Sequence, residues 1–285
     1  MVFPWNDFSG RFSPLKLLVF AGLFVPALWV MVSFGAGRLG ARPLTEAIHQ
    51  IGLWTIRLIF IALAITPLRQ ILQWPRLLLV RRMTGVAAFG YGCFHLLLYA
   101  GDQAFDLAKV ASEIVLRIYL TIGFVALLGL AALAATSTDA MIKRLGPRRW
   151  QRLHRLVYGI AVLAVVHYCM QSKLDLWEPM IMAGVLAWLL GYRLLAWRLR
   201  LRGRVPLPWL AGLSLAVPAL TALGEALYFR LALGVDPARV LSANWSLVLG
   251  LRPAAVVLVL SLAMTLLTAL RQLSSTIVKR RPRFA

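Results

Sequence analysis

Acidic residues are scarce in this chain of 285 residues, which carries 10 Asp and Glu against 31 Lys and Arg. Charged residues make up only 14% of the chain, whereas hydrophobic residues make up 61% and the mean hydropathy is +0.79. Soluble domains have an apolar share nearer ~45–50%. Almost no stretch between the hydrophobic runs could bury a water-soluble core, which excludes soluble catalytic domains and indicates a membrane protein.

Cysteine is nearly absent as well, and its two copies, Cys93 and Cys169, both lie inside apolar runs. This argues against a disulfide scaffold and fits two small buried residues. The sequence also lacks a Ser-His-Asp set, paired carboxylates and a phosphate-binding glycine loop with credible spacing. Any chemistry must therefore come from a bound cofactor.

Several apolar runs are long enough to cross a bilayer, whose hydrocarbon needs roughly 20 residues of helix. The first is too long for a cleaved signal peptide, and the short connections predict antiparallel neighbours. We therefore predict an all-α, polytopic transmembrane helix bundle. The runs fall at about residues 15–37, 51–68, 85–101, 118–137, 154–171, 179–197, 206–229 and 246–270.

Lys and Arg are distributed unevenly over the connections between these runs. Segments 1–16, 68–84, 138–155, 193–206 and 271–285 carry nearly all of the net charge of +21, while the intervening connections cancel. Positively charged loops stay on the cytoplasmic side of a membrane, so we predict that both termini are cytoplasmic. A basic inner rim also suits anionic membrane lipids, which explains the charge without nucleic acid as a partner.

Three of the four histidines fall in or at the ends of apolar runs, where ionisable side chains are costly and often functional. His95 and His167 lie in the outer halves of two runs that point the same way, so they share one depth. Such a pair suits the two axial positions of a haem, and packing through hydrogen bonds between helices is the alternative. A structural zinc site fits less well, because neither run carries a carboxylate at this depth.

His154 begins the fifth run, thirteen residues before His167. It therefore lies roughly 20 Å from that residue along a helix axis. No second imidazole shares its depth, although Met83 could in principle complete a haem site there. His154 could equally contact a flavin, a quinone or a haem propionate. His49, in the first outer connection, could cap the second helix or touch a cofactor.

Three further charged side chains fall within the runs and outside the connecting segments counted above. Arg57 lies near the depth of the outer histidine pair, where it could meet a haem propionate or extend to the outer lipid headgroups. Glu225 and Arg252 lie near the outer ends of the last two runs. We predict that they neutralise each other as a structural pair.

A series of short motifs runs through about residues 37–196. In order, they are Gly40-Ala-Arg-Pro43, Glu46-Ala-Ile-His49-Gln-Ile-Gly52, Thr66-Pro-Leu-Arg69, Arg81-Arg-Met-Thr-Gly85, His95 with Tyr99, Arg117-Ile-Tyr119 with Thr121 and Gly123, Ala135-Thr-Ser-Thr138, Arg149-Trp-Gln-Arg-Leu-His154 and His167-Tyr168. In order and spacing they resemble the MsrQ (YedZ) family, the haem-binding membrane subunits of periplasmic methionine sulfoxide reductase systems, in the ferric-reductase-like transmembrane group.

The resemblance does not extend over the whole chain. Ile118 stands where the family pattern has Pro, a local change that does not touch the histidines. The last 80 or so residues go beyond the pattern and have no role in it. We therefore predict a ferric-reductase-like haem-binding domain with a six-helix core over residues 1–197, and an extension over residues 198–285 with about two more helices.

The resemblance implies that His95 and His167 ligate haem b, with His154 as a further candidate ligand at the inner side, and that the protein carries FMN. Related ferric-reductase-like proteins hold two haems with four histidines, of which this sequence keeps three. Arginines stand where the fourth histidine, the second ligand of the inner haem, would be expected. We therefore expect flavin at the inner position, with its phosphate bound by Arg81, Arg82, Arg149 or Arg152.

The leading interpretation is an electron-transfer subunit of the bacterial inner membrane rather than a stand-alone enzyme. The resemblance implies electrons drawn from the quinone pool or a cytoplasmic flavin reductase. It also implies delivery to a periplasmic molybdopterin-containing partner that reduces methionine sulfoxide in proteins. One alternative is a ferric or other metal reductase, which the lack of an NADPH and FAD domain in this sequence disfavours. The other is a permease or assembly factor whose histidines pack or relay protons.

Overall fold

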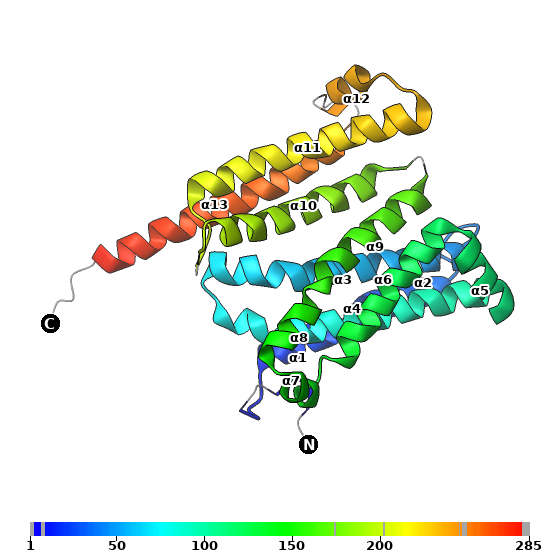
Figure 1. The fold of residues 1–285 in the computed structure, drawn as a ribbon, viewed down its shortest axis with the longest axis horizontal. Coiled ribbons are helices and arrows are strands. Elements are labelled where there is room, and N and C mark those ends of the chain that lie inside the picture. Colours follow the sequence, from blue (N-terminus) through cyan, green and yellow to red (C-terminus); the bar gives the residue numbers. More distant parts are fainter. Residues whose placement is uncertain are drawn as a thin grey trace. The chain divides into compact units, whose positions relative to one another are not determined.

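The computed structural model describes residues 3–6, 9–173, 175–201, 203–244, 246 and 250–280, with side chains as far as residue 274. Within these ranges the chain forms long helices joined by short connections (Figure 1). Eight helical segments of the described chain are long and apolar enough to cross a membrane. The all-α polytopic bundle predicted from the sequence is confirmed.

The eight candidate spans follow the predicted apolar runs. They are formed by α1 (Pro14–Gly22) with α2 (Val25–Gly35), α3 (Pro43–Leu72), η1 (Pro75–Leu77) with α4 (Leu78–Asp102), α6 (Ile118–Ala135), α8 (Pro147–His154) with α9 (Leu156–Ser172), α10 (Trp177–Arg198), α11 (Leu207–Leu233) and α13 (Pro253–Arg280). The last predicted run begins near residue 246, and residues 247–249 within it lie outside the described ranges.

Three shorter helices, α5 (Leu107–Leu116), α7 (Asp139–Leu145) and α12 (Pro237–Asn244), lie in the connections. The Asp106 carboxylate caps α5 by accepting from the Lys109 backbone N–H at 3.0 Å. The Thr138 hydroxyl caps α7 by accepting from the Met141 N–H at 3.2 Å. Such caps satisfy backbone donors that a helix start leaves free. Hydropathy alone did not predict these helices because they are too short to cross a membrane.

Two helices begin earlier than the apolar runs that predicted them. Helix α3 starts at Pro43 and carries Glu46 in its first turn, two features that favour a helix start even where the sequence is polar. The placement of His49 in a connection was therefore wrong, because His49 lies within α3 as an exposed residue. Helix α4 likewise starts at Leu78, before the third apolar run at about residue 85, and includes Arg81 and Arg82.

The fifth candidate span, Pro147–Ser172, is made of two helices. Helix α8 ends at His154, Arg155 caps it, and α9 starts at Leu156. His154 therefore ends a short basic helix, where the prediction had it begin the membrane span. The sequence Pro147-Arg-Arg-Trp-Gln-Arg-Leu-His154 is too polar to continue the apolar face of α9, which explains why hydropathy separated the two segments.

Packing divides the chain into two compact units, which are described separately. The N-terminal unit comprises Met1–Ile65 and Arg76–His167, and the C-terminal unit comprises Thr66–Pro75 and Tyr168–Ala285. The first of these holds the three histidines singled out above. The proposed domain boundary after residue 197 marks the end of the family resemblance and stays a prediction.

In the N-terminal unit, α4 packs against α1 and α6, and α5 packs against α6. Tyr91 of α4 bridges the break between α1 and α2, next to Pro26. Its hydroxyl donates to the Leu23 carbonyl at 2.6 Å and accepts from the Ala27 N–H at 3.0 Å. The break leaves backbone groups of α1 and α2 without intrahelical hydrogen bonds. The helix that carries His95 supplies the partner for two of them.

In the C-terminal unit, α10, α11 and α13 pack against one another, and α12 packs on α11. The Ser214 hydroxyl accepts from Trp188 Nε1 at 3.1 Å and donates to the Ser261 carbonyl at 3.0 Å, which joins the three long helices. The predicted pair of Glu225 and Arg252 is confirmed by an ion pair of 2.8 Å that buries the carboxylate.

Candidate metal centre

The imidazoles of His95 on α4 and His167 on α9 face each other within the N-terminal unit. Their ring centroids are 6.3 Å apart and their planes are nearly perpendicular, at 82°. A metal ion bound at about 2 Å by one nitrogen of each ring would hold the centroids roughly 6 Å apart. The separation fits a single metal between the two rings, and the depth match predicted from helix direction is realised as a direct approach.

The ring nitrogens of this pair are divided between two roles. His95 Nδ1 lies 2.8 Å from the Ile48 carbonyl, and His167 Nδ1 lies 2.7 Å from the Tyr119 carbonyl. A carbonyl oxygen can only accept, so each Nδ1 carries the proton and donates it. The Nε2 lone pair of each neutral imidazole is then free to bind a metal. This arrangement is the usual second contact of metal-binding histidines.

Two glycines provide the space in which these rings lie. A Cβ atom at Gly52 of α3 would lie 2.9 Å from His95 Nδ1, and one at Gly123 of α6 would lie 2.8 Å from His167 Nδ1. Both distances are too short for any side chain to fit without moving the ring. Each glycine lies four residues after the residue whose carbonyl accepts from the ring it contacts. Because the glycine has no side chain, that carbonyl stays accessible on the helix surface.

The pair is therefore held by two copies of one local arrangement, a backbone carbonyl and a glycine one helical turn apart. We call each copy a glycine cradle. One copy lies on α3 and the other on α6, and each receives a histidine from another helix. The Tyr119 ring also stacks on His167, with centroids 6.4 Å apart and planes at 24°. The glycine cradles and the donor set fit a haem iron with two axial imidazoles.

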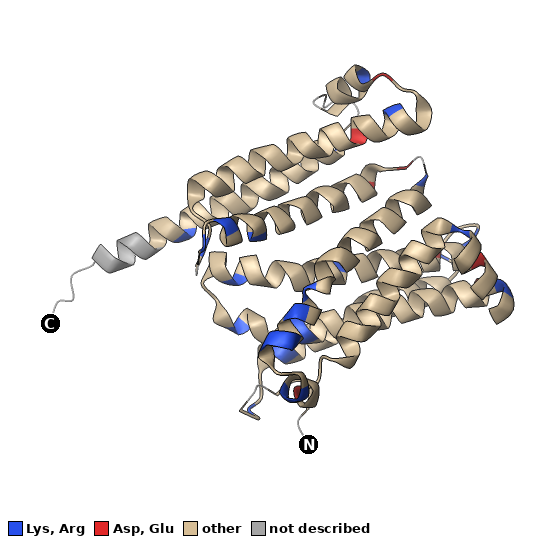
Figure 2. Ribbon diagram, viewed as in Figure 1, with Lys and Arg blue, Asp and Glu red and all other residues tan. Residues whose placement is uncertain are grey.

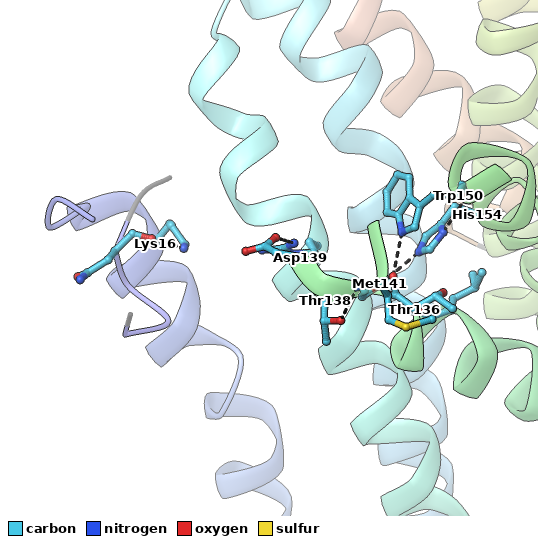
Figure 3. Close-up of polar contacts among 11 residues, drawn as sticks. Lys16, Thr136, Thr138, Asp139, Met141, Trp150 and His154 are labelled. Carbon is cyan, nitrogen blue, oxygen red and sulfur yellow. Dashed lines mark hydrogen bonds and ion pairs between the residues drawn. The ribbon is translucent and has the colours of Figure 1, made fainter. Parts of the chain in front are cut away.

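His154 has different surroundings (Figure 3). Its Nδ1 lies 3.1 Å from the Trp150 carbonyl and its Nε2 lies 3.4 Å from the Ser137 hydroxyl. The ring stacks on Trp150 at a centroid distance of 3.8 Å, and Trp150 Nε1 donates to the Thr136 carbonyl at 2.9 Å. The Ser137 hydroxyl also donates to the Leu133 carbonyl at 2.7 Å, so its contact with Nε2 is the longer of its two contacts. A metal at Nε2 would displace that hydroxyl.

The arginines assigned to the inner site are only partly brought together. Arg81 lies close enough to His154 for its charge to act on that ring. Arg82 instead forms an ion pair with Asp139 and lowers the pKa of that carboxyl. Arg149 and Arg152 are exposed on α8.

The remaining candidates stand apart from the histidine pair in their contacts. The Arg57 guanidinium lies over the Trp54 ring at 5.0 Å, a cation–π contact within α3. Among the described residues, no group of three or more His, Cys, Asp or Glu side chains could hold a metal ion. The candidate centre therefore rests on two protein ligands.

Comparison with known proteins places these residues in a family. The family model described as "Ferric reductase like transmembrane component" matches residues 51–165. A protein of Rhodospirillum rubrum named "Protein-methionine-sulfoxide reductase heme-binding subunit MsrQ" is 46% identical over 193 residues, which cover 67% of this chain and 93% of that protein. The chain belongs to the MsrQ family.

Other MsrQ relatives give the same extent of similarity. The MsrQ protein of Azospira oryzae is 41% identical over 201 residues, which cover 70% of this chain and 84% of that protein. That of Xanthomonas campestris pv. campestris is 46% identical over 166 residues, covering 58% and 76%. These MsrQ proteins are matched over most of their own length, whereas 30–42% of this chain lies outside each match. No solved structure matches the chain.

The two glycines are the site residues to which sequence reasoning gave no role. Gly52 and Gly123 both stand in the motifs that resemble the MsrQ family, but nothing in the sequence tells which helix faces them. The available signal was a glycine inside an apolar helix. Such a glycine destabilises the helix, so its presence usually indicates close packing at that position. The pairing of each glycine with one histidine needed the structure.

Proposed function

We propose that the chain is a b-type cytochrome subunit of a protein-methionine-sulfoxide reductase system, with His95 and His167 as the axial ligands of one haem. The observation that carries the proposal is the 6.3 Å separation of two imidazoles whose Nδ1 atoms are both engaged by carbonyls. The MsrQ relatives are named heme-binding subunits, which supports the same cofactor. When bound, the haem supplies one-electron redox chemistry.

The residues of the chain fix the position and electronic environment of that group. The Ile48 and Tyr119 carbonyls orient the two imidazoles and raise their basicity by accepting the Nδ1 protons. Gly52 and Gly123 let the rings lie against helix backbones. Apolar helices around the pair limit the access of water, which with ligand basicity is one of the factors that set a redox potential.

A histidine scan of the purified full-length protein tests this assignment. We expect a b-type band in the reduced-minus-oxidised spectrum that is lost in His95→Ala and in His167→Ala. His49→Ala is the matched control, because His49 lies exposed on α3, and it should leave the band unchanged. A protein with no b-type haem, or a band that survives both substitutions, would exclude the cytochrome function.

The proposed electron route runs from the quinone pool or a cytoplasmic flavin reductase to a periplasmic molybdopterin-containing reductase. The distribution of Lys and Arg supports this direction, because it orients the histidine pair toward the outer side of a bacterial inner membrane. Reduced protein should be reoxidised by methionine sulfoxide only when the molybdenum partner is present. Reoxidation by iron(III) alone would instead favour a metal reductase.

The same charge distribution supports cytoplasmic positions for both termini. A fluorescent reporter fused to the C-terminus, which folds only in the cytoplasm, should be bright in this orientation. An alkaline phosphatase fusion at the same position should be inactive, and the reverse pattern would contradict the proposed orientation.

We also propose FMN as an inner cofactor, with its phosphate near Arg81, Arg149 and Arg152. The supporting observations are the closeness of Arg81 to His154 and the exposed arginines of α8. Purified protein should contain flavin, and Arg149→Gln combined with Arg152→Gln should reduce its amount. Arg271→Gln, on α13, is the control. Flavin content that is unchanged in the double variant and in His154→Ala would remove this placement.

A further inference from the structure

The C-terminal unit has a strongly basic end that the proposed haem function does not use. The end of α3, the end of α10 and the connection to α11 carry Arg69, Arg193, Arg198, Arg200 and Arg204, and residues 66–75, 189–206 and 262–285 contain no Asp or Glu. Figure 2 shows Lys and Arg positions at the end of α10, whereas acidic positions of the unit lie at the opposite end of the same helices. Among the described residues of the unit, no Asp or Glu lies at this end.

Two of these arginines have buried nitrogens without a hydrogen-bond partner. Arg69 Nε and Arg204 NH1 are both shielded from solvent and make no hydrogen bond among the described residues. An unpaired buried donor on a charged group is costly, and native structures usually provide it with an acceptor. A bound anion would supply the acceptor that each nitrogen lacks.

The contacts of Tyr192 hold the segments that carry these two arginines. Tyr192 is buried on α10, and its hydroxyl donates to Gln70 Oε1 at 2.9 Å and also meets the backbone of Val205. Gln70 follows Arg69 directly, and Val205 follows Arg204. The end of α3 and the connection after α10 are therefore fixed to one side chain, and the charge of Arg204 acts on its hydroxyl.

A cavity opens beside the same connection. Its volume is about 560 Å³, and its lining includes Trp197, Arg198, Arg200 and Leu201. Arg200 has a φ of 49° at the end of α10, and the Leu201 N–H bonds back to the Ala196 carbonyl. Glycine is the usual residue in this left-handed position. An arginine here accepts backbone strain, and it is one of the residues that line the cavity.

We propose that the basic end of the C-terminal unit binds a phosphate group, with Arg69 and Arg204 as its buried donors and with Arg198 and Arg200, which line the cavity beside them in the chain, as further cationic groups. Guanidinium groups match the oxygens of phosphate in geometry and charge. Basic pockets between membrane helices on the cytoplasmic side take the headgroups of anionic lipids, and the phosphate of a soluble nucleotide has the same chemistry. The site is independent of haem binding.

Lipid binding to the delipidated full-length protein, followed by native mass spectrometry, tests the proposal. We expect phosphatidylglycerol to bind more tightly than phosphatidylcholine. Arg69→Gln and Arg204→Gln should each weaken that binding about tenfold, since each removes a charge-assisted hydrogen bond. Arg271→Gln is the matched control, because it removes an exposed arginine of the same unit without touching a buried donor. Helical content and the haem band should not change in any of these variants.

A second arm separates the two sources of phosphate. Inorganic phosphate and ADP are added at millimolar concentration to protein in neutral lipid, and thermal stability is measured. Stabilisation that depends on Arg69 and Arg204, together with no preference for phosphatidylglycerol, would assign the site to a soluble phosphate compound. No binding of either kind would overturn the proposal, as would an Arg271→Gln variant that weakens binding as much as Arg204→Gln.

Discussion

The histidine pair and His154 lie in the same unit, and they differ in which ring nitrogens have protein partners. His95 and His167 each engage a backbone carbonyl through Nδ1 and lie against a glycine, which leaves Nε2 for a ligand. His154 has partners on both nitrogens and an indole against its face. Their positions in the apolar runs made all three histidines candidate ligands. The hydrogen-bond partners of the ring nitrogens distinguish the two that can bind a metal from the one that is packed.

The largest effect that would break this comparison comes from filling a glycine cradle. In Gly123→Ala the new Cβ would lie 2.8 Å from His167 Nδ1. The ring must therefore move away from the Tyr119 carbonyl. We expect haem affinity to fall about 10–100-fold, as for other losses of second contacts at metal sites. Haem content after purification measures it. Gly90→Ala on α4, where a Cβ meets open space, is the control and should bind haem normally.

Gly52→Ala applies the same change to the other ring. A Cβ there would lie 2.9 Å from His95 Nδ1 and should reduce haem content to a similar degree. Normal haem content in both alanine variants would show that the cradles do not position the ligands, and the contrast with His154 would lose its basis.

Removal of His154 should affect stability more than haem binding. His154→Ala deletes a stacked ring and two polar contacts, which together stabilise the protein by about 1–2 kcal/mol. We therefore expect a lower melting temperature with an unchanged b-type band. Loss of the band in this variant, in protein that keeps its helical content, would make His154 a ligand and contradict the distinction.

The smallest expected effect concerns the exposed ion pair near His154. Arg82 lowers the pKa of Asp139 in the folded protein, so the pair stabilises the fold above the unfolded pKa of about 4 and loses this contribution as pH falls through the lower folded value. Asp139→Asn should cost less than about 1 kcal/mol at neutral pH because the pair is exposed. Its stability should match that of the parent at low pH, and haem content should not change at either pH.

Hydropathy and charge predicted most of the fold because a bilayer imposes a length on each apolar helix. They did not predict helix ends. Helix α3 carries Glu46 in its first turn and α4 carries Arg81 and Arg82 just after its first turn, and hydropathy marks where the membrane core begins rather than where the helix begins. The division of α8 from α9 and the short helices α5, α7 and α12 depend on capping and on packing at the surface.

The two candidate ligands could be predicted from the sequence. The residues that position them could not. Helix directions brought His95 and His167 to one depth, but the faces that meet Gly52 and Gly123 depend on how helices rotate against one another. The stacking of His154 on Trp150 was accessible from the sequence, because residues four apart share one face of a helix. That spacing would have indicated a local packing role alongside the proposed cofactor contact.

Electron paramagnetic resonance of the oxidised, purified protein tests the central claim most directly. Two axial imidazoles whose planes stand at 82° should give a low-spin ferric signal with the strong anisotropy of perpendicular ligands. His154→Ala should keep that signal, and His95→Ala or His167→Ala should abolish it. A high-spin signal in the parent protein, or a low-spin signal that depends on His154, would contradict the account.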